Sequence, residues 1–129
     1  MAIVLLDTDV LINFLRGMEK AKFYVQNAAS EAVPACSVVT VAEIYAGMRA
    51  HEKEKTDALL DSLEIMEVTR AIAQKAGTYK ASNRSHVLEL DDCVIAAAAF
   101  ETKALLATGN GKHYPMDDIR THVVSFAEE

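Results

Sequence analysis

Short apolar runs of strand length alternate with segments of helical spacing along this chain, and this alternation constrains its fold more than any other feature. The first run, residues 3–6, leads directly into Asp-Thr-Asp, and the helical segment that follows stops at Gly17. Strands that alternate with helices form βαβ units, which place helices on both faces of a parallel sheet. The sequence therefore predicts a three-layer α/β/α fold with a mostly parallel central sheet of about five strands.

The other elements are predicted from apolar periodicity and turn residues. Helices are expected at residues 19–31, 40–50, 56–63, 69–86 and 92–103, and strands at residues 32–39, 65–68, 104–108 and 122–126. The last of these helices is rich in alanine, so it should be buried on most of its circumference. A chain of 129 residues without repeats or a linker is expected to form one domain, residues 1–129.

Composition argues against several classes of protein. The formal net charge of −6 argues against a broad basic surface for nucleic acid. Asp7 and Asp9 interrupt the apolar amino terminus, which is therefore predicted to be neither a signal peptide nor a membrane span. Cys36 and Cys93 lie far apart in apolar runs, so they are expected to be buried, reduced thiols of a cytoplasmic protein.

One stretch of the acidic chain is locally basic. Residues 68–88 include Arg70, Lys75, Lys80 and Arg84 but no acidic residue. Such residues usually form a solvated helix face. The alternative is that they contact the phosphates of a nucleic acid.

Three acidic residues stand where a strand is predicted to give way to a helix, and each has a local structural explanation. Asp7 follows the first strand and is suited to cap the next helix. Glu43 stands three residues after Thr40, the spacing of a capping box. Asp92 opens the alanine-rich helix and competes with Asp91 as its cap.

Their shared location favours a second interpretation. The carboxyl ends of parallel strands meet at one edge of a sheet, where ligands of such folds bind. Carboxylates gathered there repel one another, and hard divalent cations such as Mg²⁺ prefer carboxylate oxygens. Such a site hydrolyses phosphodiesters by lowering the pKa of a bound water, without a nucleophilic serine or cysteine.

Four sequence blocks resemble those of PIN-domain ribonucleases, and most closely the VapC toxins of type II toxin–antitoxin systems. The blocks are LLDTDVLINFL, AEI, DDCVIAAAA and LLATGNGKHYP, in the order of that family and spread from residue 5 to residue 115. The resemblance implies a PIN-like fold and a Mg²⁺-dependent ribonuclease. It further implies an RNA substrate, a cognate antitoxin protein and a homodimer.

Position by position, the resemblance implies that Asp7, Glu43 and Asp92 are catalytic residues that hold the metal. Asp92 is chosen over Asp91 because the family's aspartate stands three residues before the Ile-Ala-Ala run. Asp9 matches a position where the family commonly has a small polar residue. It is a secondary metal candidate, or a helix cap.

The last block departs from the family pattern. Many members carry a fourth acid there, whereas this chain has Thr108, Asn110 and His113. Asn110 is a catalytic candidate and a secondary metal candidate that contributes no charge, while His113 is expected to be a loop residue. One Mg²⁺ per site is therefore expected, with Mn²⁺ as the alternative cation.

Two other functions fit parts of the sequence. Residues 7–10, Asp-Thr-Asp-Val, match the aspartyl nucleophile motif of haloacid-dehalogenase-type phosphatases, with Asp7 as the nucleophile. That family needs further motifs and a larger core. The third alternative is a catalytically degenerate PIN-like module that only binds a partner. The sequence does not identify the RNA, and transfer, ribosomal and messenger RNA all remain possible substrates.

Overall fold

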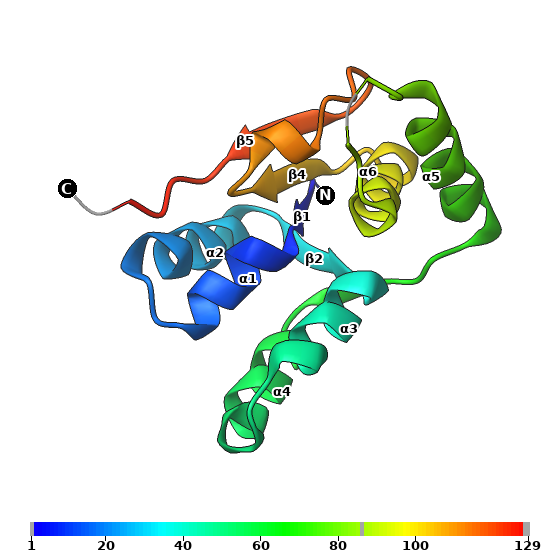
Figure 1. Ribbon diagram of the computed structural model, residues 1–129. Helices are drawn as coiled ribbons and strands as arrows, with labels where there is room; N and C mark the ends of the chain where they lie inside the picture. The colour runs from blue at the N-terminus through cyan, green and yellow to red at the C-terminus, as the bar shows by residue number, and fades with distance from the viewer. Residues whose placement is uncertain (1, 86, 128–129) are drawn as a thin grey trace.

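The centre of the fold is a parallel five-stranded sheet (Figure 1). The computed structural model describes residues 2–85 and 87–127. The strands are β1 (Ile3–Leu6), β2 (Val33–Ser37), β3 (Glu64–Met66), β4 (Leu105–Thr108) and β5 (Arg120–Val123), in the order β3-β2-β1-β4-β5. The chain leaves β1 toward one edge of the sheet and returns on its other side with β4. The strand order thus reverses beside β1, which is where sheets of this kind open a crevice at their carboxyl ends.

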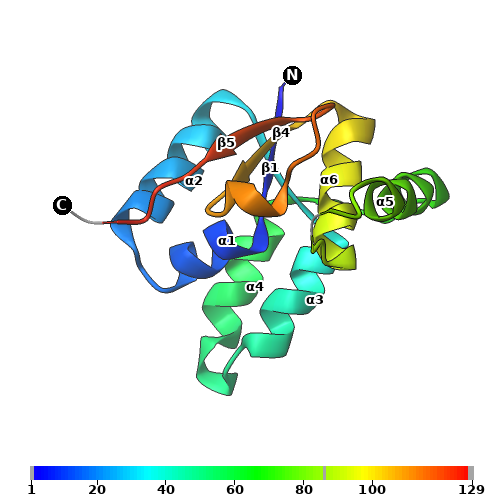
Figure 2. The same cartoon turned by 45° about the horizontal axis from the view of Figure 1, so that its top comes forward.

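Helices cover both faces of the sheet, which confirms the predicted three-layer α/β/α fold (Figures 1 and 2). Side chains of β1 alternate between the two cores: Leu5 packs on one face, and Val4 and Leu6 pack on the other. The face of Leu5 is covered by α5 (Arg70–Ser82) and α6 (Leu90–Thr102). The opposite core includes residues of α1 (Thr8–Leu15), α2 (Glu19–Glu31), α3 (Val38–Gly47) and α4 (Lys53–Asp61).

The alanine-rich helix α6 is buried as predicted. Residues 95–99, Ile-Ala-Ala-Ala-Ala, are all buried, and their small side chains let the helix pack closely against α5 and the sheet. The helix begins at Leu90, however, and its N-cap is Glu89. The prediction that Asp92 opens the helix is therefore wrong, and Asp92 lies within the first turn.

The boundary between β2 and α3 also differs from the prediction. A strand to residue 39 was expected from the β-branched pair Val38 and Val39, but β2 ends at Ser37 and α3 begins at Val38. The Ser37 hydroxyl accepts a hydrogen bond from the Val39 backbone N–H at 3.1 Å. This N-cap starts the helix despite the strand propensity of valine. The last strand, β5, likewise lies earlier than the predicted residues 122–126.

Helices α3 and α4 project away from the sheet and are joined by η1 (Ala50–Glu52) (Figure 1).

The first helix, α1, ends before Gly17, whose φ of +78° suits glycine and confirms the predicted stop. Residue 86, at the end of the predicted helix 69–86, lies outside the described residues, and α5 ends at Ser82. In the part of the chain that is described, no helix combines the length and apolar character needed to cross a bilayer.

Candidate active site

Asp7 lies at the carboxyl end of β1, in the middle of the sheet, and is only 6% exposed. Its Oδ1 accepts a hydrogen bond from the Thr8 backbone N–H at 2.8 Å, so the capping role predicted for Asp7 is confirmed. Its Oδ2 accepts a hydrogen bond from the Thr108 hydroxyl at 2.7 Å, at the end of β4. Because each carboxylate oxygen has two lone pairs, both oxygens keep capacity for a further ligand.

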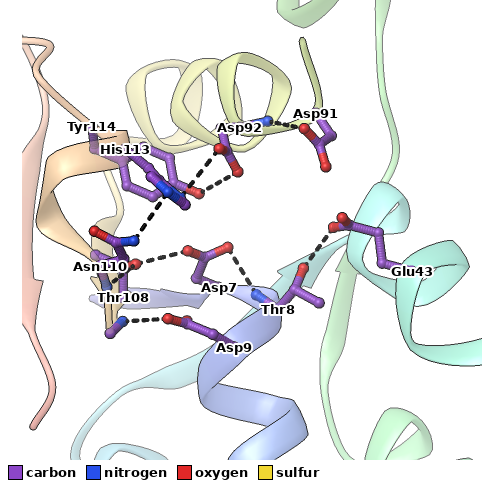
Figure 3. Close-up of polar contacts among 11 residues, drawn as sticks. Asp7, Thr8, Asp9, Glu43, Asp91, Asp92, Thr108, Asn110, His113 and Tyr114 are labelled. Carbon is purple, nitrogen blue, oxygen red and sulfur yellow. Dashed lines mark hydrogen bonds and ion pairs between the residues drawn. The ribbon is translucent and has the colours of Figure 1, made fainter. Parts of the chain in front are cut away.

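Glu43 projects from α3 toward the end of β1 (Figure 3). The Thr8 hydroxyl donates to Glu43 Oε1 at 2.7 Å and lies 3.0 Å from the Thr40 hydroxyl. The predicted capping box is wrong, because Thr40 is buried inside the first turn and Ser37 caps the helix. The Glu43 carboxylate is therefore turned toward the β1–α1 junction and not toward its own helix terminus.

Asp91 and Asp92 both lie in the first turn of α6. Asp91 Oδ1 accepts a hydrogen bond from the Asp92 backbone N–H at 3.0 Å, and neither residue is the N-cap. Figure 3 shows Asp92 turned toward the loop after β4 and Asp91 on the side of Glu43. The Asp92 carboxylate is thus left without a capping role.

The loop after β4 closes the other side of the site. It contains Asn110 and the short helix η2 (Gly111–His113). His113 Nδ1 lies 3.4 Å from Asp92 Oδ2, and the Tyr114 hydroxyl lies 3.4 Å from Asp92 Oδ1. His113 lies in this loop, as expected, and its ring faces a predicted metal ligand.

Asp9 has a different orientation from the other acids. Its Oδ2 accepts a hydrogen bond from the Gly109 backbone N–H at 2.9 Å, so Asp9 connects α1 to the loop after β4. Burial, together with the negative charge of Asp7, raises the pKa of Asp9. Gly109 fits here because a Cβ would lie 2.3 Å from the Phe126 ring and 2.5 Å from Asp9 Oδ2.

The carboxyl groups of the site have raised pKa values. Burial, followed by the negative charges of Asp91 and Asp7, raises the pKa of Asp92 to about 6. Burial and a hydrogen bond with Asp91 raise the pKa of Glu43 to about 7. Burial also raises the pKa of the Tyr114 hydroxyl, which remains a neutral donor beside Asp92. These raised pKa values indicate that the acidic rim formed by Asp7, Glu43, Asp91 and Asp92 lacks a positive charge that would stabilise the ionised carboxylates.

The chemistry of the rim fits a hard divalent cation. Its donors are mainly carboxylate oxygens, which Mg²⁺ and Mn²⁺ prefer. Among the described residues, no three histidine, cysteine or acidic side chains converge closely enough to enclose an ion alone. Mg²⁺ usually completes its coordination with water and substrate phosphate. An open rim of this kind is consistent with a cation that is held by some protein oxygens and completes its coordination with water or substrate phosphate.

Comparison with known proteins decides the family. A model of the PIN domain matches residues 4–119. The chain is also 39% identical over 115 residues to Ribonuclease VapC10 of Mycobacterium tuberculosis, covering 88% of this chain and 86% of that protein. The chain belongs to the VapC family of PIN domains.

Solved structures share the fold of this VapC-family PIN domain. The structure of VapBC2 from Rickettsia felis, bound to a DNA fragment from their promoter, has a TM-score of 0.84 at 19% identity and covers 95% of this chain and 99% of that chain. A toxin–antitoxin complex from Klebsiella pneumoniae has a TM-score of 0.77 at 26% identity, covering 98% and 99% of the two chains. The family resemblance inferred from the sequence blocks is confirmed.

The same comparison weakens the phosphatase alternative. The matched residues of this VapC-family PIN domain include the Asp-Thr-Asp-Val motif, and its second aspartate, Asp9, binds the Gly109 N–H. An acid/base partner for an Asp7 nucleophile would need that carboxylate free to reach a substrate.

Four residues at the site were not predicted: Thr8, Asp91, His113 and Tyr114. Thr8 stands between two aspartates in the first block. Asp91 directly precedes Asp92, the residue that matches the family's aspartate. His113 and Tyr114 lie in the block that departs from the family pattern. The blocks contained these residues, but their side-chain partners come from other elements of the fold.

Proposed function

We propose that this VapC-family protein is a divalent-cation-dependent ribonuclease and the toxin of a toxin–antitoxin pair. The proposal rests on one arrangement: Asp7, Glu43 and Asp92 come from three different elements and face the same rim at the carboxyl edge of the sheet (Figure 3). VapC10, the relative that is 39% identical, is a ribonuclease, which supports RNA as the substrate.

Asp7, Asp92 and Glu43 would hold the cation, and Mg²⁺ suits their oxygen donors best. A bound cation would neutralise the charge of the scissile phosphate and lower the pKa of the attacking water. Asp7 is the most firmly held of the three, because hydrogen bonds from Thr8 and Thr108 restrain its two oxygens. This rigidity maintains the geometry of the site at little entropic cost on binding.

Burial and a hydrogen bond with Asp91 raise the pKa of Glu43 to about 7, and a bound cation would favour its ionised form. Thr8 orients this carboxylate through the hydrogen bond from its hydroxyl to Oε1. Thr8 is therefore a positioning residue in the proposed mechanism.

Only part of the basic stretch of residues 68–88 remains suited to bind RNA phosphates. Lys75 forms an ion pair with Asp118 at 2.9 Å, and Lys80 donates to the backbone carbonyl of Leu88 at 2.6 Å. Arg84 is exposed near the end of α5, and its Nε donates to a carbonyl of its own chain segment. Arg70, at the start of α5, is also exposed, so Arg70 and Arg84 are the candidates for a phosphate contact outside the acidic rim.

The proposed partners follow from the family. Among the solved structures that share this fold are toxin–antitoxin complexes, which supports an antitoxin as the partner of this chain. We also propose that the chain forms one domain and that two copies form a homodimer. Co-expression with the product of an adjacent small reading frame tests the binding of an antitoxin. Light scattering of the purified protein tests the homodimer, and a monomer at micromolar concentration would contradict it.

Cleavage of RNA by the purified chain tests the proposed activity. Mg²⁺ or Mn²⁺ should support cleavage, and EDTA, Asp7→Asn and Asp92→Asn should each abolish it. Asp61→Asn, at an exposed position near the end of α4, is the matched control and should remain active. Circular dichroism verifies that each variant is folded. Folded wild-type protein that cleaves no RNA with any divalent cation would instead favour the degenerate binding module.

A further inference from the structure

The imidazole of His113 has no role in the mechanism proposed above, although it faces the cation site. Its side chain is 51% exposed, whereas that of Asp92, its neighbour, is 16% exposed. The ring therefore lies at the mouth of the site, above a carboxylate that the fold has largely buried. It also stands in the sequence block where many VapC proteins carry a fourth acid.

The distance between His113 Nδ1 and Asp92 Oδ2 is 3.4 Å. A charge-assisted N–H···O hydrogen bond is usually shorter, about 2.7–2.9 Å. Two ligand atoms that are each about 2.1 Å from one ion lie roughly 3.0–3.4 Å apart, depending on the angle between them. The separation of these two atoms is longer than a short charge-assisted hydrogen bond and has the length expected of two ligands to one cation.

Asn110 holds the far side of the same ring. Its side-chain amide lies 3.0 Å from His113 Nε2, and its backbone N–H is bound by the Thr108 hydroxyl at 3.1 Å. A metal bound at Nδ1 leaves the proton of the neutral ring on Nε2. The amide atom that faces Nε2 is Nδ2. With the amide rotated by 180° so that Oδ1 faces the ring, Asn110 accepts a hydrogen bond from the Nε2–H group, as the outer partners of metal-bound histidines commonly do.

We propose that His113 is a nitrogen ligand of the catalytic cation, shared with Asp92 and oriented by Asn110. This inference rests on the proposed cation-dependent function and adds a ligand to its site. A nitrogen donor in place of a fourth carboxylate has two consequences. Imidazole binds Mn²⁺ and later transition metals better than Mg²⁺, and the site carries less negative charge with which to hold Mg²⁺. The cation preference of this chain should therefore be shifted toward Mn²⁺.

Electron spin-echo envelope modulation of the Mn²⁺-loaded 129-residue chain tests the ligand directly, without RNA. The wild type should show the nitrogen coupling of a directly bound imidazole, and His113→Gln should lose it. His51→Gln and His122→Gln are matched controls that should retain the coupling, because His51 lies in η1 and the His122 ring on β5 stacks on Tyr24 of α2. Thermal unfolding verifies that the variants are folded.

Calorimetric titration with Mn²⁺ and Mg²⁺ gives a second readout. His113→Gln should weaken Mn²⁺ binding by roughly 10-fold or more and Mg²⁺ binding less, and His113→Asp should reverse the preference toward Mg²⁺. A wild type without nitrogen coupling, a coupling that survives in His113→Gln, or the absence of Mn²⁺ binding would each overturn the proposal. RNA cleavage by the same wild-type sample would then show that the proposed function stands without this ligand.

Discussion

Replacing Asp92 with asparagine should stabilise the protein in the absence of a cation. Burial and the charges of Asp91 and Asp7 raise the pKa of Asp92 from 3.8 to about 6. At about 1.36 kcal/mol per pKa unit, the ionised carboxylate costs the folded state about 3 kcal/mol. Because water partly screens this carboxylate, we expect about 1 kcal/mol to remain. That corresponds to a rise in Tm of roughly 3–5 °C for a domain of this size.

The size of the effect depends on pH. The folded-state pKa of Asp92, about 6, lies above the ordinary value of 3.8, so the native state binds more protons than the unfolded chain between these two values. The stability of the wild type should therefore fall as pH rises through this window. Asparagine does not titrate, so the advantage of the variant should be small near pH 4 and complete above about pH 7.

Urea unfolding in EDTA, at about pH 4.5 and about pH 7.5, measures this difference. Asp61→Asn, on the exposed surface of α4, is the control and should show a change close to zero at both values. Mg²⁺ or Mn²⁺ should stabilise the wild type more than Asp92→Asn. A variant that is less stable than the wild type near neutral pH, or equally stabilised at both values, would refute this account of the site.

Three further predictions concern single contacts. Thr8→Val removes the hydrogen bond to Glu43 and should slow RNA cleavage by roughly 10- to 100-fold, with activity restored by Thr8→Ser; an unchanged rate rejects the positioning role. Gly109→Ala introduces a Cβ that would lie 2.3 Å from the Phe126 ring. It should lower the free energy of unfolding by about 1–3 kcal/mol in urea titrations, and equal stability would contradict the close packing. Arg84→Glu should weaken RNA binding by roughly 3- to 10-fold in fluorescence anisotropy at low salt, whereas equal affinity excludes a phosphate contact there.

Local patterns in the sequence were enough to predict the layers of the fold. The strand at residues 3–6 and the helix at residues 19–31 have the predicted bounds, because apolar periodicity and Gly17 mark them locally. Errors arose where a local pattern has two meanings. Val38 and Val39 favour a strand, but the side chain of Ser37 caps a helix there. The catalytic roles of Asp7, Glu43 and Asp92 remain predictions.

By itself, the sequence determined the fold class and the family and singled out three acids, because burial periodicity and short motifs depend on neighbouring residues. Of these acids, only Asp7 stands directly between a strand and a helix; Glu43 lies inside α3, and Asp92 lies in the first turn of α6 after a loop. Only the tertiary structure decided which polar groups meet. Thr8 and Glu43 are 35 residues apart, and Asp7 and Thr108 are 101 apart. These pairs form because the strand order brings β1 beside β4 and places α3 against the β1–α1 junction. The contact of His113 with Asp92 has the same origin, and no spacing along the chain reveals it.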